Sequence, residues 1–154
     1  MVMHNTLVRE RPYHEIEIGE SFSVTKVITE ADITNFAGII GDFNPIHVNP
    51  EYAKTTMFGQ RIAHGMLTAS FISTCVGCGI PGINALYVSQ EINFLKPVYI
   101  GDTITAKVEV VGKIDGKQRV IMRSTITNQR DELVVDGKSV AMVMKKRDSQ
   151  GQFS

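Results

Sequence analysis

The sequence predicts an α+β fold in which a long antiparallel sheet is wrapped around one buried central helix. Two observations carry this prediction. The second half of the chain holds four segments in which apolar and polar residues alternate, as in strands with one buried face. Residues 64 to about 79 are instead apolar on nearly every side, which is typical of a helix buried inside a fold.

Length and charge narrow the class of protein. A chain of 154 residues falls in the usual range for one domain, so we expect a single domain over residues 1–154 with its core at about 22–145. The formal net charge is zero, which argues against a nucleic-acid partner. The basic cluster Lys145-Lys146-Arg147 is interpreted as a solvated end. With neither a signal-peptide pattern nor a long apolar stretch, we expect a soluble cytoplasmic protein without a membrane partner.

The two cysteines, Cys75 and Cys78, form a C-x-x-C pattern that occurs in redox pairs and in half zinc sites. The sequence has no second pair to complete a zinc site, and the surrounding segment is an apolar helix rather than a strand-to-helix redox turn. We therefore predict two small side chains packed on a buried helix.

The first half of the chain predicts a strand followed by helices. An irregular lead-in ends at Gly19, and residues 22–28 alternate as a strand does. Thr29 and Asp32 then form a capping-box pattern that opens a helix, which Gly41 ends. Pro45 keeps the loop that follows extended, and residues 50–54 are expected to form one short helical turn.

The second half predicts four strands joined by turns. Asp115-Gly116 is a strong hairpin signal between the second and third of them. The four expected strands are 85–94, 103–113, 118–128 and 133–145.

A candidate acid–base pair lies directly after the first helix. Asp42 and His47 are five residues apart in a loop, close enough for a carboxylate and an imidazole to share one water molecule. Asn44, between them, could orient the ring or accept from a backbone amide. The alternative is an Asx-turn, in which Asp42 and Asn44 cap backbone groups and His47 is merely exposed.

A second candidate group lies where the buried helix begins. The first amides of a helix have no internal acceptor, and Gly65 would let a ligand oxygen approach one closely. Such an amide could stabilise a developing oxyanion. The alternative is that Gly65 only relieves crowding between helix and sheet. Ser70 and Ser73 follow on the same helix, and each could bond back to its own helix or face a cavity.

These residues resemble the MaoC-like, (R)-specific enoyl-CoA hydratases of the hot-dog fold. The resemblance covers about residues 22–145, and its most specific part is Asp42-Phe43-Asn44-Pro45-Ile46-His47. Further parts are Gly59 to Ile62, Ala63-His64-Gly65-Met66-Leu67, Phe94-Leu95-Lys96-Pro97-Val98 and Gly101-Asp102.

The resemblance implies reversible syn addition of water to a trans-2-enoyl thioester. Asp42 would be the general base, and His47 would position the water and share the proton transfers. The amide of Gly65 would bind the thioester oxygen, with Ser73 in a supporting role. Asn44 is a further candidate for substrate binding. Every motif position carries the family's residue.

The resemblance also implies a homodimer whose sheets join edge to edge, with coenzyme A as part of the substrate and neither a metal nor another cofactor.

Three alternatives share the fold. They are a dehydratase of hydroxyacyl carrier protein or of branched or dicarboxylic acyl-CoA, a thioesterase, which does not usually carry this loop, and a non-catalytic acyl-CoA-binding module. The length of the acyl chain does not follow from the sequence.

Overall fold

The computed structural model describes residues 8–145 of the chain. His4, the rest of the N-terminal segment before Val8, and Lys146 and Arg147 of the basic cluster lie outside the described residues. Among the helices of the described part, none has both the length and the hydropathy that a membrane crossing requires.

One five-stranded antiparallel sheet forms the body of the molecule, with the strand order β1-β3-β4-β5-β2. Its strands are β1 (Ser21–Val27), β2 (Ala85–Phe94), β3 (Thr103–Ile114), β4 (Arg119–Thr127) and β5 (Leu133–Val143). The predicted bounds of β2 are confirmed, and those of the other strands differ by one or two residues at either end. The alternating pattern placed them well because one face of each strand packs on the core and the other meets water.

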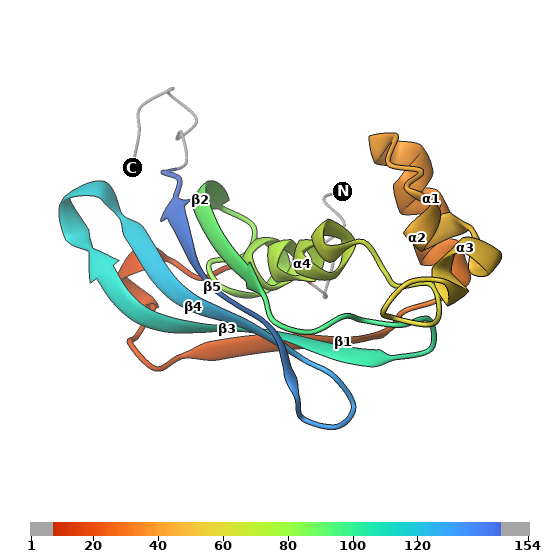
Figure 1. The fold of residues 1–154 in the computed structure, drawn as a ribbon. Coiled ribbons are helices and arrows are strands. Elements are labelled where there is room, and N and C mark those ends of the chain that lie inside the picture. The colour runs from red at the N-terminus through yellow and green to blue at the C-terminus, as the bar shows by residue number, and fades with distance from the viewer. Residues whose placement is uncertain (1–7, 146–154) are drawn as a thin grey trace.

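Helix α4 (Gly65–Thr74) lies against the concave face of this sheet (Figure 1). Leu67 and Ile72 of the helix belong to the same core cluster as the inward side chains of β3 and β4. The inward residues of β3 are 1% exposed or less and are Ile104, Ala106, Val108 and Val110. Each buried Ile or Val side chain contributes roughly 1.5–3 kcal/mol through its removal from water. The predicted α+β, hot-dog architecture is confirmed.

The extent and burial of the central helix differ from the prediction. The α-helix ends at Thr74, and a π-helical turn, η2 (Cys75–Gly79), completes the segment. Met66, Ser70 and Ser73 are exposed. The expectation of a helix buried on every side was therefore wrong, because the sheet covers one side of α4 and the opposite side faces a cavity.

The cysteine prediction is confirmed for Cys75, whereas Cys78 is only half-buried. Cys75 is buried, and its thiol donates to the carbonyl oxygen of Ala106 at 3.3 Å. Burial raises the pKa of the Cys75 thiol to about 11, so it stays protonated at neutral pH. Neither Cys75 nor Cys78 forms a disulfide.

Three helices stand beyond the start of α4, at one end of the sheet (Figure 1). They are α1 (Glu30–Ile40), α2 (Pro45–Val48) and α3 (Pro50–Lys54). The capping box of Thr29 and Asp32 is present, and Gly41 ends α1 in the left-handed conformation with φ 77°, both as predicted. The capping residues at the two ends of α1 therefore determine that Asp42 directly follows the helix.

The turn between β3 and β4 joins the two strands as an antiparallel hairpin. Residues Asp115–Lys117 form a 3-10 turn, η3, and Gln118 follows in the left-handed conformation with φ 47°. The hairpin predicted at Asp115-Gly116 is therefore confirmed, and its change of direction is shared over the four residues between Ile114 and Arg119.

Candidate active site

The segment after α1 is built by two successive side-chain caps. The Asp42 carboxylate accepts from the backbone amide of Asn44 at 3.1 Å, and the Asn44 side chain accepts from the amide of Ile46 at 3.2 Å. Asn44 is thus the N-cap of α2, with Pro45 in the first turn. His47 lies on this helical turn rather than in a loop, which corrects the sequence interpretation. The Asx-turn alternative described the backbone correctly, but it does not leave His47 as a mere surface residue.

The half-buried ring of His47 is held through one nitrogen. Its Nδ1 lies 2.8 Å from the carbonyl oxygen of Ile62. A carbonyl oxygen only accepts, so this contact requires a proton on Nδ1. In the neutral ring, Nε2 then carries the lone pair, and it is the nitrogen able to take a proton from water.

His64 joins the predicted pair. Its side chain is 2% exposed, and its Nε2 lies 3.0 Å from the carbonyl oxygen of Asp42. Its ring stacks on that of His47, with ring centroids 3.9 Å apart and planes 28° apart. His64 belongs to the motif that carries the family resemblance, but the resemblance implied no role for it. The available signal was its position directly before Gly65.

Asp42, His47 and His64 place one carboxylate oxygen and two ring nitrogens within 4.8 Å of one another. Among the described residues, these three form the group whose side chains could together hold a metal ion. An imidazole binds a metal in its ring plane, however, and these two rings face each other. A carboxylate beside an imidazole with a free lone pair suits proton transfer to and from one water molecule better.

Gly65 is the first residue of α4, so its N–H lies in the first turn, where amides have no intrahelical acceptor. A Cβ at this position would lie 3.0 Å from the ring of Phe94. The lack of a side chain therefore matters here, because Phe94 closes one side of the helix start. The strand-like approach to Gly65 is fixed by the amide of Ala63, which donates to the carbonyl oxygen of Val98 at 2.8 Å.

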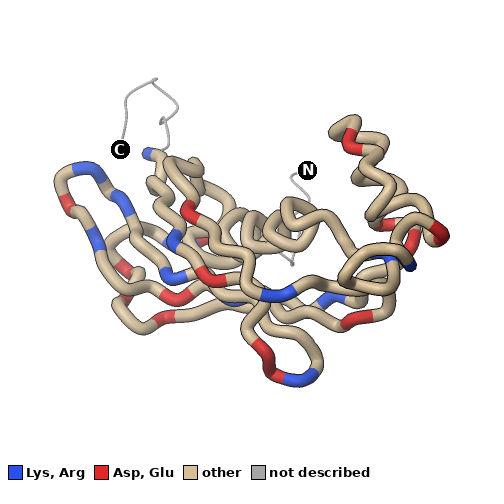
Figure 2. The backbone as a smooth tube through the Cα atoms, in the orientation of Figure 1, with Lys and Arg blue, Asp and Glu red and all other residues tan. Residues whose placement is uncertain are grey.

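Two cavities lie beside the start of α4. One of about 300 Å³ is lined by Phe58, Ile62, Ala63, Gly65, Thr68, Phe94, Leu95, Lys96, Pro97, Val98 and Val135. The other, of about 430 Å³, is lined by Phe36, Ile40, Met66, Ala69, Ser70, Ser73, Tyr87, Gln90 and Ile92. Figure 2 shows that α4, which separates them, carries no charged residue. The site therefore has apolar space next to its polar groups.

The predicted serines have different surroundings. The Ser70 hydroxyl donates to the backbone oxygen of Leu67 at 2.6 Å, so it bonds back to its own helix. Ser73 is exposed and lines the larger cavity, whereas Gly65 lines the smaller one. The structure thus places Asp42, His47 and Gly65 around one end of α4, and Ser73 lies two turns further along.

Comparison with known proteins identifies the family. The family model described as "MaoC like domain" matches residues 14–131. The chain belongs to the MaoC-like domain family. It is 47% identical over 131 residues to an (R)-specific enoyl-CoA hydratase of Rhodospirillum rubrum, covering 85% of this chain and 90% of the relative. It is 41% identical over 137 residues to a 3-hydroxybutyryl-CoA dehydratase of Methylorubrum extorquens, covering 89% and 87%.

A solved structure supports the same family assignment. The unliganded R-hydratase PhaJ1 of Pseudomonas aeruginosa superposes with a TM-score of 0.84 at 40% sequence identity. The match covers 88% of this chain and 87% of that one. The MaoC-like fold is therefore shared with a protein named as a hydratase.

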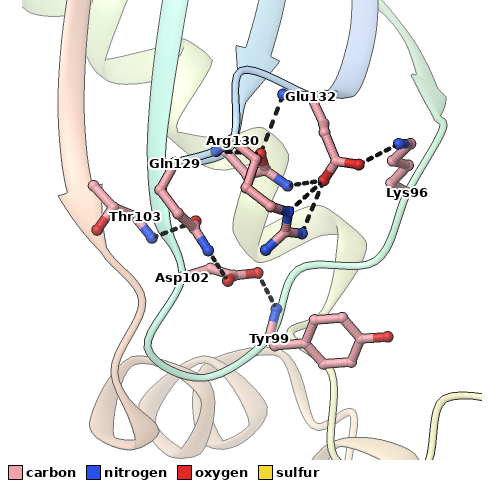
Figure 3. A network of polar contacts seen from close by, with 8 residues as sticks. Lys96, Tyr99, Asp102, Thr103, Gln129, Arg130 and Glu132 are labelled. Atoms are coloured by element: carbon pink, nitrogen blue, oxygen red, sulfur yellow. Dashed lines mark hydrogen bonds and ion pairs between the residues drawn. The ribbon is translucent and has the colours of Figure 1, made fainter.

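A polar network supports the MaoC-like site from the side of the sheet (Figure 3). The Asp102 carboxylate accepts from the amide of Tyr99 at 2.9 Å and from the side chain of Gln129 at 2.6 Å. Tyr99 in turn forms a β-bridge with Ile62, whose carbonyl holds His47. The network thus fixes a segment on which His47 depends.

Glu132 anchors the other half of this network (Figure 3). Its carboxylate accepts from the side chains of Asn128, Lys96 and Arg130 at 2.8, 2.6 and 2.9 Å. These bonds favour the ionised carboxylate and lower the pKa of Glu132 to about 2.

Proposed function

We propose that the chain is an (R)-specific enoyl-CoA hydratase, which adds water reversibly to trans-2-enoyl-CoA and forms (R)-3-hydroxyacyl-CoA. The observation that carries the proposal is the Asp42–His47 pair beside the Gly65 amide. The names of the relatives, (R)-specific enoyl-CoA hydratase and 3-hydroxybutyryl-CoA dehydratase, describe the two directions of this chemistry.

The reaction assigns one task to each group. Asp42 takes a proton from the water molecule while the oxygen of that water attacks C3 of the enoyl group. His47 Nε2 orients the same water molecule by accepting a hydrogen bond from it through its lone pair. The negative charge that develops on the thioester oxygen is bound by the Gly65 N–H. The acid–base pair then returns the proton to C2, on the face from which the water came. The addition is syn because the hydroxyl group and the proton reach the same face of the double bond.

The acyl chain is assigned to the larger cavity. Its lining is almost entirely apolar, it runs along α4 from Met66 to Ser73, and it begins one residue after the proposed oxyanion donor. The smaller cavity beside Gly65 is then left for the pantetheine arm. Asn44 acts by capping α2, a contact that the structure contains, and direct binding of substrate by Asn44 or Ser73 remains a prediction.

Coenzyme A enters as part of the substrate, and the mechanism requires no metal and no further cofactor. We further propose that the protein is cytoplasmic and that it forms a homodimer. Support for the dimer comes from β2, an edge strand of the described sheet, with Leu86, Tyr87 and Val88 exposed on it. Sedimentation at micromolar concentration would report a dimer, and a monomer would contradict this part.

The test of function is loss of enoyl absorbance when purified protein is mixed with crotonyl-CoA and longer enoyl-CoAs. Steady turnover supports the proposal, and tight acyl-CoA binding without turnover would identify a binding module instead. Matched CoA and carrier-protein thioesters separate the dehydratase alternative, because a carrier-protein enzyme should strongly prefer the latter.

A further inference from the structure

His64 is buried beside the proposed catalytic pair, and the mechanism above gives it no task. Its side chain touches the two catalytic residues in different ways. Nε2 lies 3.0 Å from the carbonyl oxygen of Asp42, and the ring stacks on His47 at 3.9 Å between centroids. Phe36 meets the His64 ring edge-on at 5.3 Å between centroids, so the ring is confined on a further side.

The backbone of His64 reaches the third group of the site. His64 is the N-cap residue of α4, and the proposed oxyanion donor Gly65 is the next residue. The carbonyl of His64 accepts from the amide of Thr68 at 3.1 Å, which starts the helix ladder. One residue thus contacts Asp42 and His47 through its side chain and carries Gly65 through its backbone.

The bond to Asp42 has a defined direction. A carbonyl oxygen only accepts, so Nε2 of His64 must carry the proton. The other ring nitrogen, Nδ1, is buried and has no hydrogen-bond partner within residues 8–145. Within that range, the hydrogen bond of this ring is therefore the one to Asp42, a residue 22 positions earlier in the chain.

We infer that His64 is a positioning residue, which keeps the backbone of Asp42 and the ring of His47 at fixed positions relative to the Gly65 amide. The inference rests on the proposed hydratase function. The carboxylate of Asp42 is exposed and is tied only to its own turn, at Asn44, among the described residues. The contact from His64 joins that turn to the start of α4. Catalytic groups displaced by about 1 Å can lose on the order of a hundredfold in rate, so this link is expected to affect kcat.

Three substitutions separate the hydrogen bond from the packing. His64→Gln keeps a donor at the position of Nε2, His64→Asn offers one only at the position of Nδ1, and His64→Phe keeps a ring without a donor. We expect kcat to fall on the order of ten- to a hundredfold in the Asn and Phe variants, with KM changed less than about threefold. The Gln variant should recover most of the lost kcat. Equal rates in Gln and Phe variants would overturn the inference.

A double-mutant cycle distinguishes positioning from general disruption. If His64 acts through Asp42, His64→Phe should cost little further rate in a protein that already carries Asp42→Asn. Fully additive losses would indicate a structural role only and overturn the inference. Thermal denaturation of each variant checks that it is folded, and the Asn variant replaces the Phe variant in the cycle if the latter does not fold.

An activity-independent measurement keeps this inference separate from the proposed function. Long-range ¹⁵N–¹H spectra of the wild-type imidazoles should show the Nε2–H tautomer for His64 and the Nδ1–H tautomer for His47. The opposite tautomer at His64 would overturn the contact even in an active enzyme. If the wild type hydrates no enoyl-CoA, the proposed function fails, and the spectra alone decide whether His64 holds Asp42.

Discussion

At the scale of single residues, the site depends on which atom of each side chain is already engaged. His47 uses Nδ1 for the carbonyl of Ile62, and Asp42 uses one carboxylate oxygen for the amide of Asn44. Each therefore keeps a second atom for a water molecule. Substitutions can be chosen that preserve the engaged atom and remove the other.

Asp42→Asn and His47→Asn are such substitutions. The side-chain amide oxygen introduced at position 42 can still accept from the backbone of Asn44, and a side-chain amide at position 47 still places a donor at the position of Nδ1. Either change removes a proton acceptor, so kcat should fall at least about a hundredfold. Steady-state hydration of crotonyl-CoA measures it. A near-normal rate in both variants would remove the roles assigned here.

The role of the Gly65 amide can be tested without breaking α4. Proline is tolerated in the first helical position, where its missing N–H leaves no intrahelical bond unmade. His64 has φ −56° and ψ 134°, the extended conformation that a residue before proline prefers. Gly65→Pro should therefore lower kcat roughly a hundredfold by removing an oxyanion donor.

Gly65→Ala is the matched control for that variant. It adds a Cβ against Phe94 but keeps the N–H, so its loss of kcat measures crowding alone. Equal losses in the Pro and Ala variants would show that crowding, and not the amide, explains the effect.

At the scale of elements, α4 separates two cavities and begins at the site. Its apolar composition correctly predicted contact with the sheet, because several of its residues pack into the core. The same composition led to the wrong expectation of burial on all sides. An apolar surface that faces a cavity has the same sequence pattern as one that faces a protein core.

The assignment of the acyl chain to the larger cavity predicts a change in chain-length preference. Ser70 is exposed on α4 and lines that cavity, so Ser70→Leu should fill part of it. Hydration of octenoyl-CoA should then fall at least about tenfold relative to crotonyl-CoA, since pocket contacts of this size are worth that much.

Leu95→Phe is the control in the smaller cavity and should leave the chain-length ratio unchanged. The reverse result, a changed ratio in the Leu95 variant alone, would place the acyl chain beside Gly65 instead.

The local signals in the sequence were sufficient for much of the site. The capping box, Gly41 and Pro45 are short-range devices, and they set the positions of α1, Asp42 and α2. The contacts of His64 were not predictable in this way, because they join residues 22 positions apart through a ring orientation that no periodicity encodes. The same holds for the carbonyl of Ile62, which selects the tautomer of His47.

At the scale of the whole molecule, the sheet supports the site through its ends. The Glu132 and Asp102 contacts fix the turns at one end of β3, β4 and β5 (Figure 3). The segment from Val98 to Tyr99 in turn contacts Ile62 and Ala63 through backbone bonds. The carbonyl of Ile62 that holds His47 is therefore supported by contacts outside the site.

Glu132 makes part of the stability dependent on pH. Its pKa is lowered from 4.5 to about 2 in the folded protein, so its contribution is present above the unfolded value and is lost as pH falls toward 2. Wild type should be more stable than Glu132→Gln at neutral pH, and the difference should shrink between pH 4.5 and about 2. Urea denaturation of both proteins measures it. A difference that does not depend on pH would contradict this account of Glu132.

The central claim is that Asp42, His47 and the Gly65 amide perform an (R)-specific hydration. The most direct measurement is the configuration of the product formed from crotonyl-CoA, determined with (R)- and (S)-specific 3-hydroxyacyl-CoA dehydrogenases. We expect (R)-3-hydroxybutyryl-CoA from the wild type and almost no product from Asp42→Asn. An (S) product, or equal product from both proteins, would contradict it.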